Sequence, residues 1–305
     1  MRRVVFFGSD GIGVGTLDWL AERSGEFFEI VGVVGGADRR SGRGMRSRSN
    51  PIVERARALG FPVLQPEDPR TDLLGPLVRF AADLCVVFAY GHILRREILD
   101  AVPGGFLNIH GSILPELRGP NPIGGAILAG KRETGISLMR MVRRMDAGPV
   151  YAVERVPVAD GETAISLGEK LSAAAIVALD KRFKDILDGS LQPREQEEER
   201  ATYTAMVRKE DGILHFDRPA AELEMQVRAH VGWPGSFFPL GKEMVRVGRV
   251  TAGAGNAENS PGKILGLCGG ALEIATGDGI LRCFELQRPF RKMLPAELVW
   301  LTLRP

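Results

Sequence analysis

The sequence predicts an α/β domain with a mostly parallel sheet, followed by a small β-barrel domain. A chain of 305 residues exceeds the usual length of one domain, so we expect two, each with its own core. In the first half, apolar runs alternate with amphipathic segments, which is typical of βαβ units in a Rossmann-like sheet covered by helices. Near the C-terminus, short β-type runs separated by glycine indicate an OB-like barrel.

The first domain is expected to begin with alternating strands and helices. Strands are predicted at residues 3–7, 30–34, 84–89 and 105–109, and helices at residues 13–22, 51–59 and 94–101. Open α/β sheets bind ligands beyond the carboxyl ends of their strands. Functional residues are therefore sought where these strands end.

A long amphipathic helix is predicted over residues 163–188, where apolar residues recur at helical spacing without a proline. The next stretch is rich in glutamate and poor in apolar residues, which indicates a linker. We expect a first domain at residues 1–189, a linker at 190–204 and a C-terminal domain at 205–305. In the last, a helix is expected at 219–230 and strands at 244–250, 262–267, 271–275 and 280–286.

The composition is that of a folded globular protein. With 44% hydrophobic and 26% charged residues, the chain fits neither a disordered nor a fibrous class. Cys85, Cys268 and Cys283 form no C-x-x-C pair and predict neither a disulfide framework nor a metal site. The first apolar run is too short for a signal peptide, and no stretch reaches membrane-spanning length. We expect a cytoplasmic monomer without membrane association.

Positive charge is concentrated in one short region. The net charge is only +2, so the chain as a whole is not a polycation. Between Asp38 and Arg57, seven arginines stand against two acids, a local excess of five positive charges. This indicates an electrostatic footprint on one patch, although a solvated basic loop would have the same composition. The arginines are Arg39, Arg40, Arg43, Arg46, Arg48, Arg55 and Arg57.

The predicted strand at residues 105–109 contains the polar residue Asn108, and a second polar residue, His110, follows directly after it. Side chains two apart on a strand point to the same face, so these two are expected to converge at the strand's end. An amide beside an imidazole suits a reaction at a carbonyl carbon. The amide can hydrogen-bond a developing oxyanion, and the imidazole can donate to it or move a proton.

Asp146 supplies an acid on a predicted turn after the apolar run at residues 135–141. A carboxylate beside the imidazole would favour its charged form and help remove a proton from an attacking amine. Spacing alone leaves open whether Asp146 and His110 meet. A single histidine in a strand is more often a structural residue.

Gly8, Gly11 and Gly13 follow the first strand and precede a helix, as in dinucleotide-binding domains. Their spacing does not fit G-x-G-x-x-G, and a tight strand-to-helix turn explains glycine there without a phosphate. No dinucleotide site is predicted.

The stretch from Asn108 to Pro122 reads N-I-H-G-S-I-L-P-x-x-R-G-x-x-P and resembles the signature of the 10-formyltetrahydrofolate-dependent formyltransferases. Residues 134–137 and 146–148 resemble that family's second and third blocks. The resemblance implies a formyltransferase catalytic domain that uses 10-formyltetrahydrofolate as donor and no metal. It implies Asn108, His110 and Asp146 as the catalytic residues: the first two stabilise the oxyanion and the acid manages the proton.

The resemblance also implies where the folate binds. Residues 112–115 align with the family's folate-contacting Ser-Leu-Leu-Pro, and residues 88–94 resemble the loop that lines the pteridine pocket. Core packing explains Tyr90 and Ile93 equally well, and His92 is placed at the pocket rim. The implied folate contacts are Ser112, Ile113, Leu114, Pro115, Phe88, Tyr90, Gly91 and Ile93.

Resemblance to the branch of the family that acts on methionyl-tRNA runs nearly end to end, through residues 39–44, 201–203, 209–212, 233–235 and 275–279. It implies methionyl initiator tRNA as the formyl acceptor, in support of translation initiation, with the C-terminal domain binding tRNA. In similar enzymes the basic loop wedges into the acceptor stem, and Arg43 matches its key arginine. Arginines suit this task because they neutralise phosphates and stack on unpaired bases. The implied tRNA contacts are Arg39, Arg40, Arg43, Arg46 and Arg48.

Other readings stay open. Residues 108–112 and 141–148 also resemble formyltransferases that act on nucleotide-linked amino sugars. The methionyl-tRNA branch more often has Ala at the position of Gly111 and acids before Asp146, and Glu116 and Pro120-Asn121 depart from it as well. The C-terminal domain has thirteen Lys or Arg against eleven Asp or Glu, a weak signal for RNA. A noncatalytic RNA-binding module would not need the three catalytic residues, and a formyltetrahydrofolate hydrolase would not need the basic loop.

Overall fold

The computed structural model describes residues 1–41, 46–255 and 260–303, and the chain divides into two compact units. Unit 1 comprises Met1–Pro122, Glu133–Pro157 and Gly168–Thr204. Unit 2 comprises Ile123–Arg132, Val158–Leu167 and Ala205–Pro305. Two short segments from the first 189 residues are therefore grouped with the C-terminal part. The domain limits expected at residues 189 and 205 therefore stay predictions.

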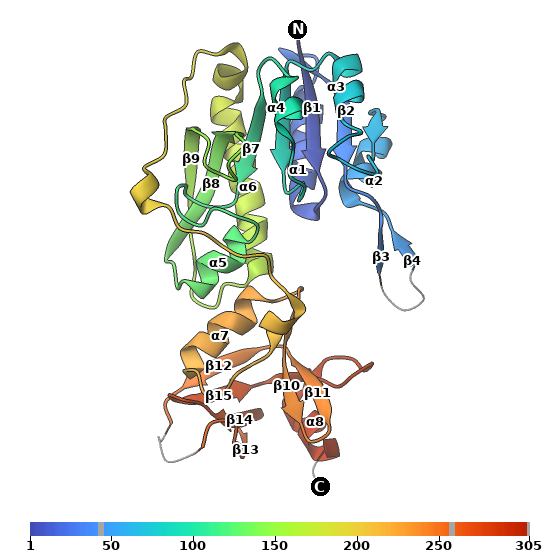
Figure 1. Cartoon of the computed structure of the whole chain (residues 1–305). Coiled ribbons are helices and arrows are strands. Elements are labelled where there is room, and N and C mark those ends of the chain that lie inside the picture. The colour runs from blue at the N-terminus through green and yellow to red at the C-terminus, as the bar shows by residue number, and fades with distance from the viewer. Residues whose placement is uncertain (42–45, 256–259, 304–305) are drawn as a thin grey trace. The chain divides into compact units, whose positions relative to one another are not determined.

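Unit 1 is built on a seven-stranded sheet in the order β5-β2-β1-β6-β7-β8-β9 (Figure 1). The first five of these strands pair in parallel, whereas β8 and β9 are antiparallel. Strand β6 is buried along its whole length, as expected for a parallel strand covered on both faces. The predicted mostly parallel sheet is confirmed. The strands are β1 (Arg2–Gly8), β2 (Phe28–Gly35), β5 (Val63–Leu64), β6 (Leu84–Phe88), β7 (Phe106–His110), β8 (Glu133–Arg140) and β9 (Val150–Pro157).

Helices cover the sheet on both sides. On one side, the Phe183 ring of α6 packs edge-on against Trp19 of α1 and Phe28 of β2. On the other, side chains of α3 and α4 share a core with Phe7 and Phe106. The helix predicted at residues 163–188 is present as α6. The helices are α1 (Val14–Arg23), α2 (Pro51–Ala58), α3 (Leu74–Phe80), α4 (Arg96–Asp100), α5 (Pro122–Leu128), whose residues after Pro122 belong to unit 2, and α6 (Ala164–Asp188).

A hairpin projects from unit 1 between β2 and α2 (Figure 1). Its strands, β3 (Arg39–Ser41) and β4 (Arg46–Arg48), pair antiparallel. The base of the hairpin is closed, because the Asn50 amide donates to the Gly36 carbonyl at 3.2 Å while its oxygen caps α2. Gln65 donates to the Asp38 carboxylate at 2.9 Å, and this bond holds the pKa of Asp38 below its usual value. The hairpin therefore leaves the sheet from a fixed point.

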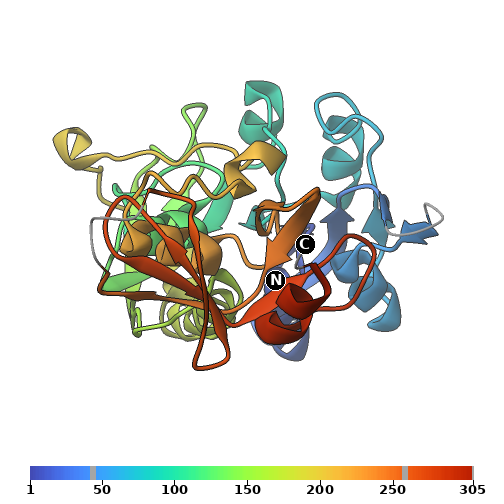
Figure 2. The same cartoon turned by 90° about the horizontal axis from the view of Figure 1, so that it is seen from below.

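Unit 2 contains two four-stranded antiparallel sheets, in the orders β10-β11-β16-β17 and β12-β15-β14-β13. Residues of both sheets, of α7 and of α8 form one core, with Leu223, Phe238, Ile274 and Leu286 among them. Figure 2 shows these orange and red strands from below. The elements are α7 (Ala220–Ala229), β10 (Ser236–Leu240), β11 (Glu243–Val247), β12 (Val250–Gly253), β13 (Ile264–Cys268), β14 (Ala271–Ala275), β15 (Ile280–Cys283), β16 (Glu285–Gln287), β17 (Leu294–Pro295) and α8 (Ala296–Leu303).

Two strands predicted as continuous, at residues 244–250 and 280–286, each divide between the two sheets of unit 2. The breaks face one another: Gly248 N–H donates to Glu285, and Phe284 N–H donates to the Arg249 carbonyl, both at 2.9 Å. Strands that switch sheets at a bend close two sheets around one core. The predicted small antiparallel β domain is confirmed in this form.

Among the described residues, no helix combines the length and apolar character needed to cross a membrane.

Candidate active site

Strand β7 brings Asn108 and His110 to the carboxyl edge of the parallel strands. They follow Phe106 at intervals of two and therefore lie on the same face of the sheet. His110 is buried, whereas Asn108 is partly exposed. Within the described part of the chain, no group hydrogen-bonds the Asn108 side chain, so its amide is available to a ligand.

The His110 ring has a different oxygen at each nitrogen. Its Nε2 lies 3.0 Å from the Leu117 carbonyl oxygen, and its Nδ1 lies 3.7 Å from Oδ2 of Asp146. A carbonyl oxygen only accepts, so the bond to Leu117 requires the proton on Nε2. Nδ1 is then the atom that can take up a proton. The Asp146 carboxylate is beyond hydrogen-bond distance but close enough to stabilise the charged ring.

Asp146 lies on a turn with a left-handed backbone, at φ 50°. Its Oδ2 accepts a 2.8 Å hydrogen bond from Gly119 N–H. A left-handed conformation in a residue with a Cβ persists only where its surroundings hold it. Gly148, two residues later, must be glycine because a Cβ there would collide with the Arg140 carbonyl oxygen. The structure thus brings His110 and Asp146 together, while their catalytic role stays a prediction.

The loop at residues 112–115 is fixed by Ser137 of β8. The Ser137 hydroxyl donates to the Ser112 carbonyl at 2.7 Å and accepts from Leu114 N–H at 3.0 Å. Ser112 and Leu114 are buried, whereas Ile113 and Pro115 are partly exposed. The Ser112 hydroxyl is already bonded to the Glu116 carbonyl, at 2.6 Å. These residues form an ordered loop beside His110, and their folate contacts stay a prediction.

The second predicted folate loop divides into buried and exposed residues. Phe88 and Tyr90 are buried, and Tyr90 packs edge-on against Phe7 with 5.2 Å between ring centroids. Gly91 and Ile93 are exposed. Within the described chain the Tyr90 hydroxyl has no hydrogen-bond partner, and burial raises its pKa. Tyr90 therefore packs in the core, yet it retains one unsatisfied donor.

Four of the five predicted tRNA contacts, Arg39, Arg40, Arg46 and Arg48, belong to the β3–β4 hairpin. Arg43 lies outside the described residues. The five contacts stay predictions.

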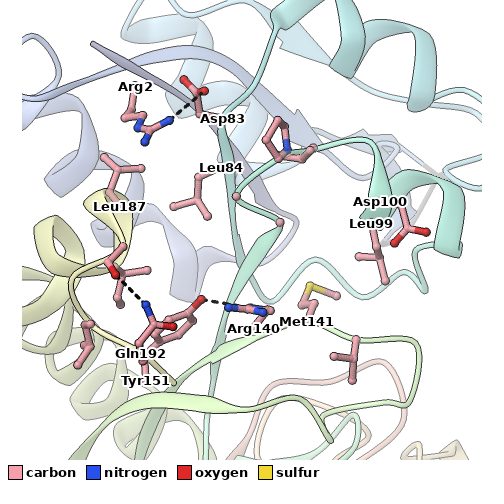
Figure 3. Close-up of a pocket in the computed structure, with 18 of the residues that line it drawn as sticks. Arg2, Asp83, Leu84, Leu99, Asp100, Arg140, Met141, Tyr151, Leu187 and Gln192 are labelled. Carbon is pink, nitrogen blue, oxygen red and sulfur yellow. Dashed lines mark hydrogen bonds and ion pairs between the residues drawn. The ribbon is translucent and has the colours of Figure 1, made fainter. Parts of the chain in front are cut away.

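A cavity of about 790 Å³ lies at the opposite edge of the sheet, where β1 and β6 begin and β8 ends (Figure 3). Arg2, Asp83 and Leu84 line it from the strand starts, and Arg140 and Tyr151 from β8 and β9. In this lining, Arg2 pairs with Asp83 and Arg96 with Asp100, and Arg140 hydrogen-bonds the Tyr151 hydroxyl. None of the predicted catalytic or folate residues lines this cavity.

The described residues contain no cluster of three or more His, Cys, Asp or Glu side chains that could hold a metal. All three cysteines are free thiols.

Three residues that hold the site, Ser137, Arg118 and Gln196, carry no sequence pattern that assigns them this task. Ser137 and Arg118 lie inside the motif blocks, and Gln196 lies in the predicted linker. The one signal at Gln196 is that it is an uncharged polar residue within a run of glutamates.

Family comparisons match both parts of the chain. The model described as "Formyl transferase" matches residues 2–181, and the model described as "Formyl transferase, C-terminal domain" matches residues 206–304.

Two curated relatives are similar over nearly the whole chain. The methionyl-tRNA formyltransferase of Sorangium cellulosum is 38% identical over 297 residues, which cover 96% of this chain and 94% of that protein. The methionyl-tRNA formyltransferase of Myxococcus xanthus is 38% identical over 295 residues, covering 96% and 93%.

Among solved structures, the sugar 3N-formyl transferase WlaRD, crystallised in the presence of dTDP and 5-N-formyl-THF, superposes with a TM-score of 0.69. The match covers 96% of this chain and 99% of that one at 15% identity. At this identity the similarity establishes the fold alone.

Proposed function

The chain belongs to the formyl transferase family, and we propose that it transfers the formyl group of 10-formyltetrahydrofolate to the amino group of methionyl initiator tRNA, which supports translation initiation. The observation that carries the proposal is the meeting of His110 and Asp146, with 3.7 Å between Nδ1 and Oδ2, beside the unbonded Asn108 amide. Relatives that carry this activity in their names are similar over 96% of the chain.

In the proposed reaction, the folate donor supplies an activated formyl carbon. The amine of the acceptor forms a bond to this carbon, and the bond between the formyl group and the folate nitrogen breaks. Asn108 donates a hydrogen bond to the formyl oxygen as negative charge develops there. One preorganised donor of this kind contributes on the order of 10²–10³ in rate.

His110 accepts the proton of the attacking amine and later returns it. The Leu117 carbonyl keeps a proton on Nε2, so Nδ1 can accept the proton that the attacking amine loses. The Asp146 carboxylate stabilises the positive ring that results. The protonated Nδ1 then donates a hydrogen bond to the oxyanion and returns the proton to the leaving folate nitrogen, which balances the transfer.

The donor is expected to bind beside the ordered loop at residues 112–115 and the exposed part of residues 88–94. The partly exposed Asn108 amide is a polar group that such a ligand could hydrogen-bond. It supports the fit of a folate donor beside the loop.

The acceptor is assigned to tRNA because of the basic hairpin. Four arginines lie on its two paired strands, and Arg43 lies between them in the sequence. A closed base at Gly36 and Asn50 lets the hairpin extend toward a large polyanion. An amino sugar carried by a nucleotide is far smaller than a tRNA stem, and its binding would not require a projecting basic hairpin.

We further infer that residues 1–189 carry the chemistry, that residues 205–305 hold the tRNA, and that the enzyme works as a cytoplasmic monomer. The free thiols of Cys85, Cys268 and Cys283 support a reducing compartment. Light scattering during gel filtration measures the mass, and a dimer would contradict the monomer.

Transfer of a labelled formyl group tests the function directly. Purified protein is incubated with methionyl initiator tRNA and 10-formyltetrahydrofolate labelled in its formyl carbon. We expect the label on the methionine nitrogen after the ester is hydrolysed. Label released only as formate would indicate hydrolysis of the donor and overturn the proposal.

A further inference from the structure

The segment expected to be a linker is bonded to the loop next to the candidate catalytic pair. The Thr202 hydroxyl accepts from Leu117 N–H at 2.8 Å, and its carbonyl accepts from Arg118 N–H at 2.9 Å. Thr204 N–H donates to the Arg118 carbonyl at 2.7 Å. Residues 202–204 therefore run alongside residues 117–118 like a neighbouring strand.

These loop residues are the ones that touch the candidate catalytic side chains. Leu117 gives its carbonyl to His110 Nε2, and Gly119 gives its N–H to Asp146 Oδ2. Both neighbours of Arg118 thus contact a predicted catalytic residue. Whatever holds Arg118 in place also holds the partners of His110 and Asp146.

Arg118 is held by its side chain as well, which is fully buried. Its guanidinium donates to the Gln196 side-chain oxygen at 2.8 and 3.1 Å, to Glu198 at 3.0 Å and to the Tyr203 hydroxyl at 3.0 Å. A buried guanidinium is stable only when its donors are satisfied and its charge is compensated. Three residues of the 190–204 segment meet this need.

Gln196 uses both ends of its amide. The oxygen accepts two bonds from Arg118, so the nitrogen must point the other way. That nitrogen donates to the backbone carbonyls of Asp146, at 2.8 Å, and Gly148, at 2.6 Å. Gln196 therefore connects the buried arginine to the left-handed turn that presents the Asp146 carboxylate.

We propose that Gln196 is a positioning residue: it anchors the Asp146–Gly148 turn to Arg118 and so aims the Asp146 carboxylate at His110 Nδ1. The proposal rests on the proposed function, because it assigns a task within the formyl-transfer site. Gln196 contacts none of the reacting atoms. Its effect reaches the reaction through the backbone of Asp146.

The test is Gln196→Ala, with Gln192→Ala as the matched control. Gln192 stands four residues earlier in the same segment, and its amide donates to the Gly189 carbonyl at 2.8 Å, away from the site. We expect kcat of Gln196→Ala to fall roughly 10- to 100-fold, as for a misplacement of about 1 Å. The KM for the folate donor should stay within about twofold, and the pH dependence of kcat should change because Asp146 no longer faces His110.

Gln196→Glu separates positioning from folding. This variant keeps an oxygen for Arg118 but loses the N–H donors to the two carbonyls. We expect its melting temperature to stay near that of the unsubstituted enzyme and its kcat to fall as in Gln196→Ala.

A kcat for Gln196→Glu equal to that of Gln192→Ala, with an unchanged pH profile, would overturn the inference. If the unsubstituted enzyme and Gln192→Ala both lack formyl transfer, the proposed function itself fails, which is a distinguishable result.

Discussion

The candidate active site and the β3–β4 hairpin are built in opposite ways. The His110 and Asp146 side chains are largely buried, and Leu117, Gly119 and Gln196 hydrogen-bond these two residues. The hairpin is a projecting pair of short strands, and hydrogen bonds of Asn50 and Gln65 hold its base. Preorganised groups suit transition-state stabilisation, whereas an arginine-rich hairpin suits a large anionic surface.

Under the proposed function, the surroundings of His110 and Asp146 carry the reaction, and the β3–β4 hairpin carries the choice of acceptor. Changes near His110 should slow the transfer for any acceptor. Changes in the hairpin should weaken the use of tRNA and its dependence on salt. Four variants test these assignments, and they follow in order of decreasing expected effect.

The largest effect is expected from His110→Ala, which removes the group that takes up the amine's proton. We expect kcat to fall about 10³-fold, within the range for loss of a general acid or base. His215→Ala is the control, since His215 is exposed and lies in unit 2. A kcat within tenfold of the unsubstituted enzyme, measured by single turnover, would remove His110 from the mechanism.

Asp146→Asn should cost roughly 10²-fold in kcat. The amide oxygen can still accept from Gly119 N–H, but the negative charge 3.7 Å from Nδ1 is lost. Folate binding, measured by calorimetry, should be unchanged. Equal losses in folate affinity and kcat would instead point to a collapsed loop.

Arg43→Ala should lower kcat/KM for methionyl-tRNA by roughly tenfold and reduce the salt slope by about one unit, as for the loss of one phosphate contact. Arg96→Ala is the matched control. Arg96 is exposed, pairs with Asp100 at 3.1 Å and lines the cavity at the opposite edge of the sheet. Identical salt slopes for the two variants would contradict a role for the hairpin.

Glu198→Gln should have the smallest effect, on stability. The hydrogen bond from Arg118 holds the pKa of Glu198 below its ordinary value of 4.5. A lowered carboxylate pKa stabilises the folded state above 4.5, and this contribution is lost as the pH falls through the lowered folded-state pKa. The variant should melt about 1–3 °C lower at neutral pH, with the difference closing as the pH falls below the ordinary value of 4.5. A constant difference across pH would show that the charge is not the cause.

Local patterns predicted the elements that carry the site, but not the contacts that complete it. Apolar runs indicated β6 and β7, and helical spacing indicated α6, because these patterns arise within each segment. The bonds of Arg118 to Gln196 and of Asp146 to Gly119 join residues 78 and 27 positions apart, and no local pattern encodes them. The same limit explains the strand predicted at residues 244–250: its break at Gly248 follows from its partner near Glu285.

The most direct test of the account offers two acceptors to the enzyme in the same assay. Methionyl initiator tRNA and a nucleotide-linked 4-amino sugar are incubated separately with labelled 10-formyltetrahydrofolate, and kcat/KM is measured for each. The account predicts efficient formylation of the tRNA and none of the sugar above the rate without enzyme. Faster formylation of the sugar would leave the chemistry at His110 standing but contradict the acceptor and the role of the hairpin.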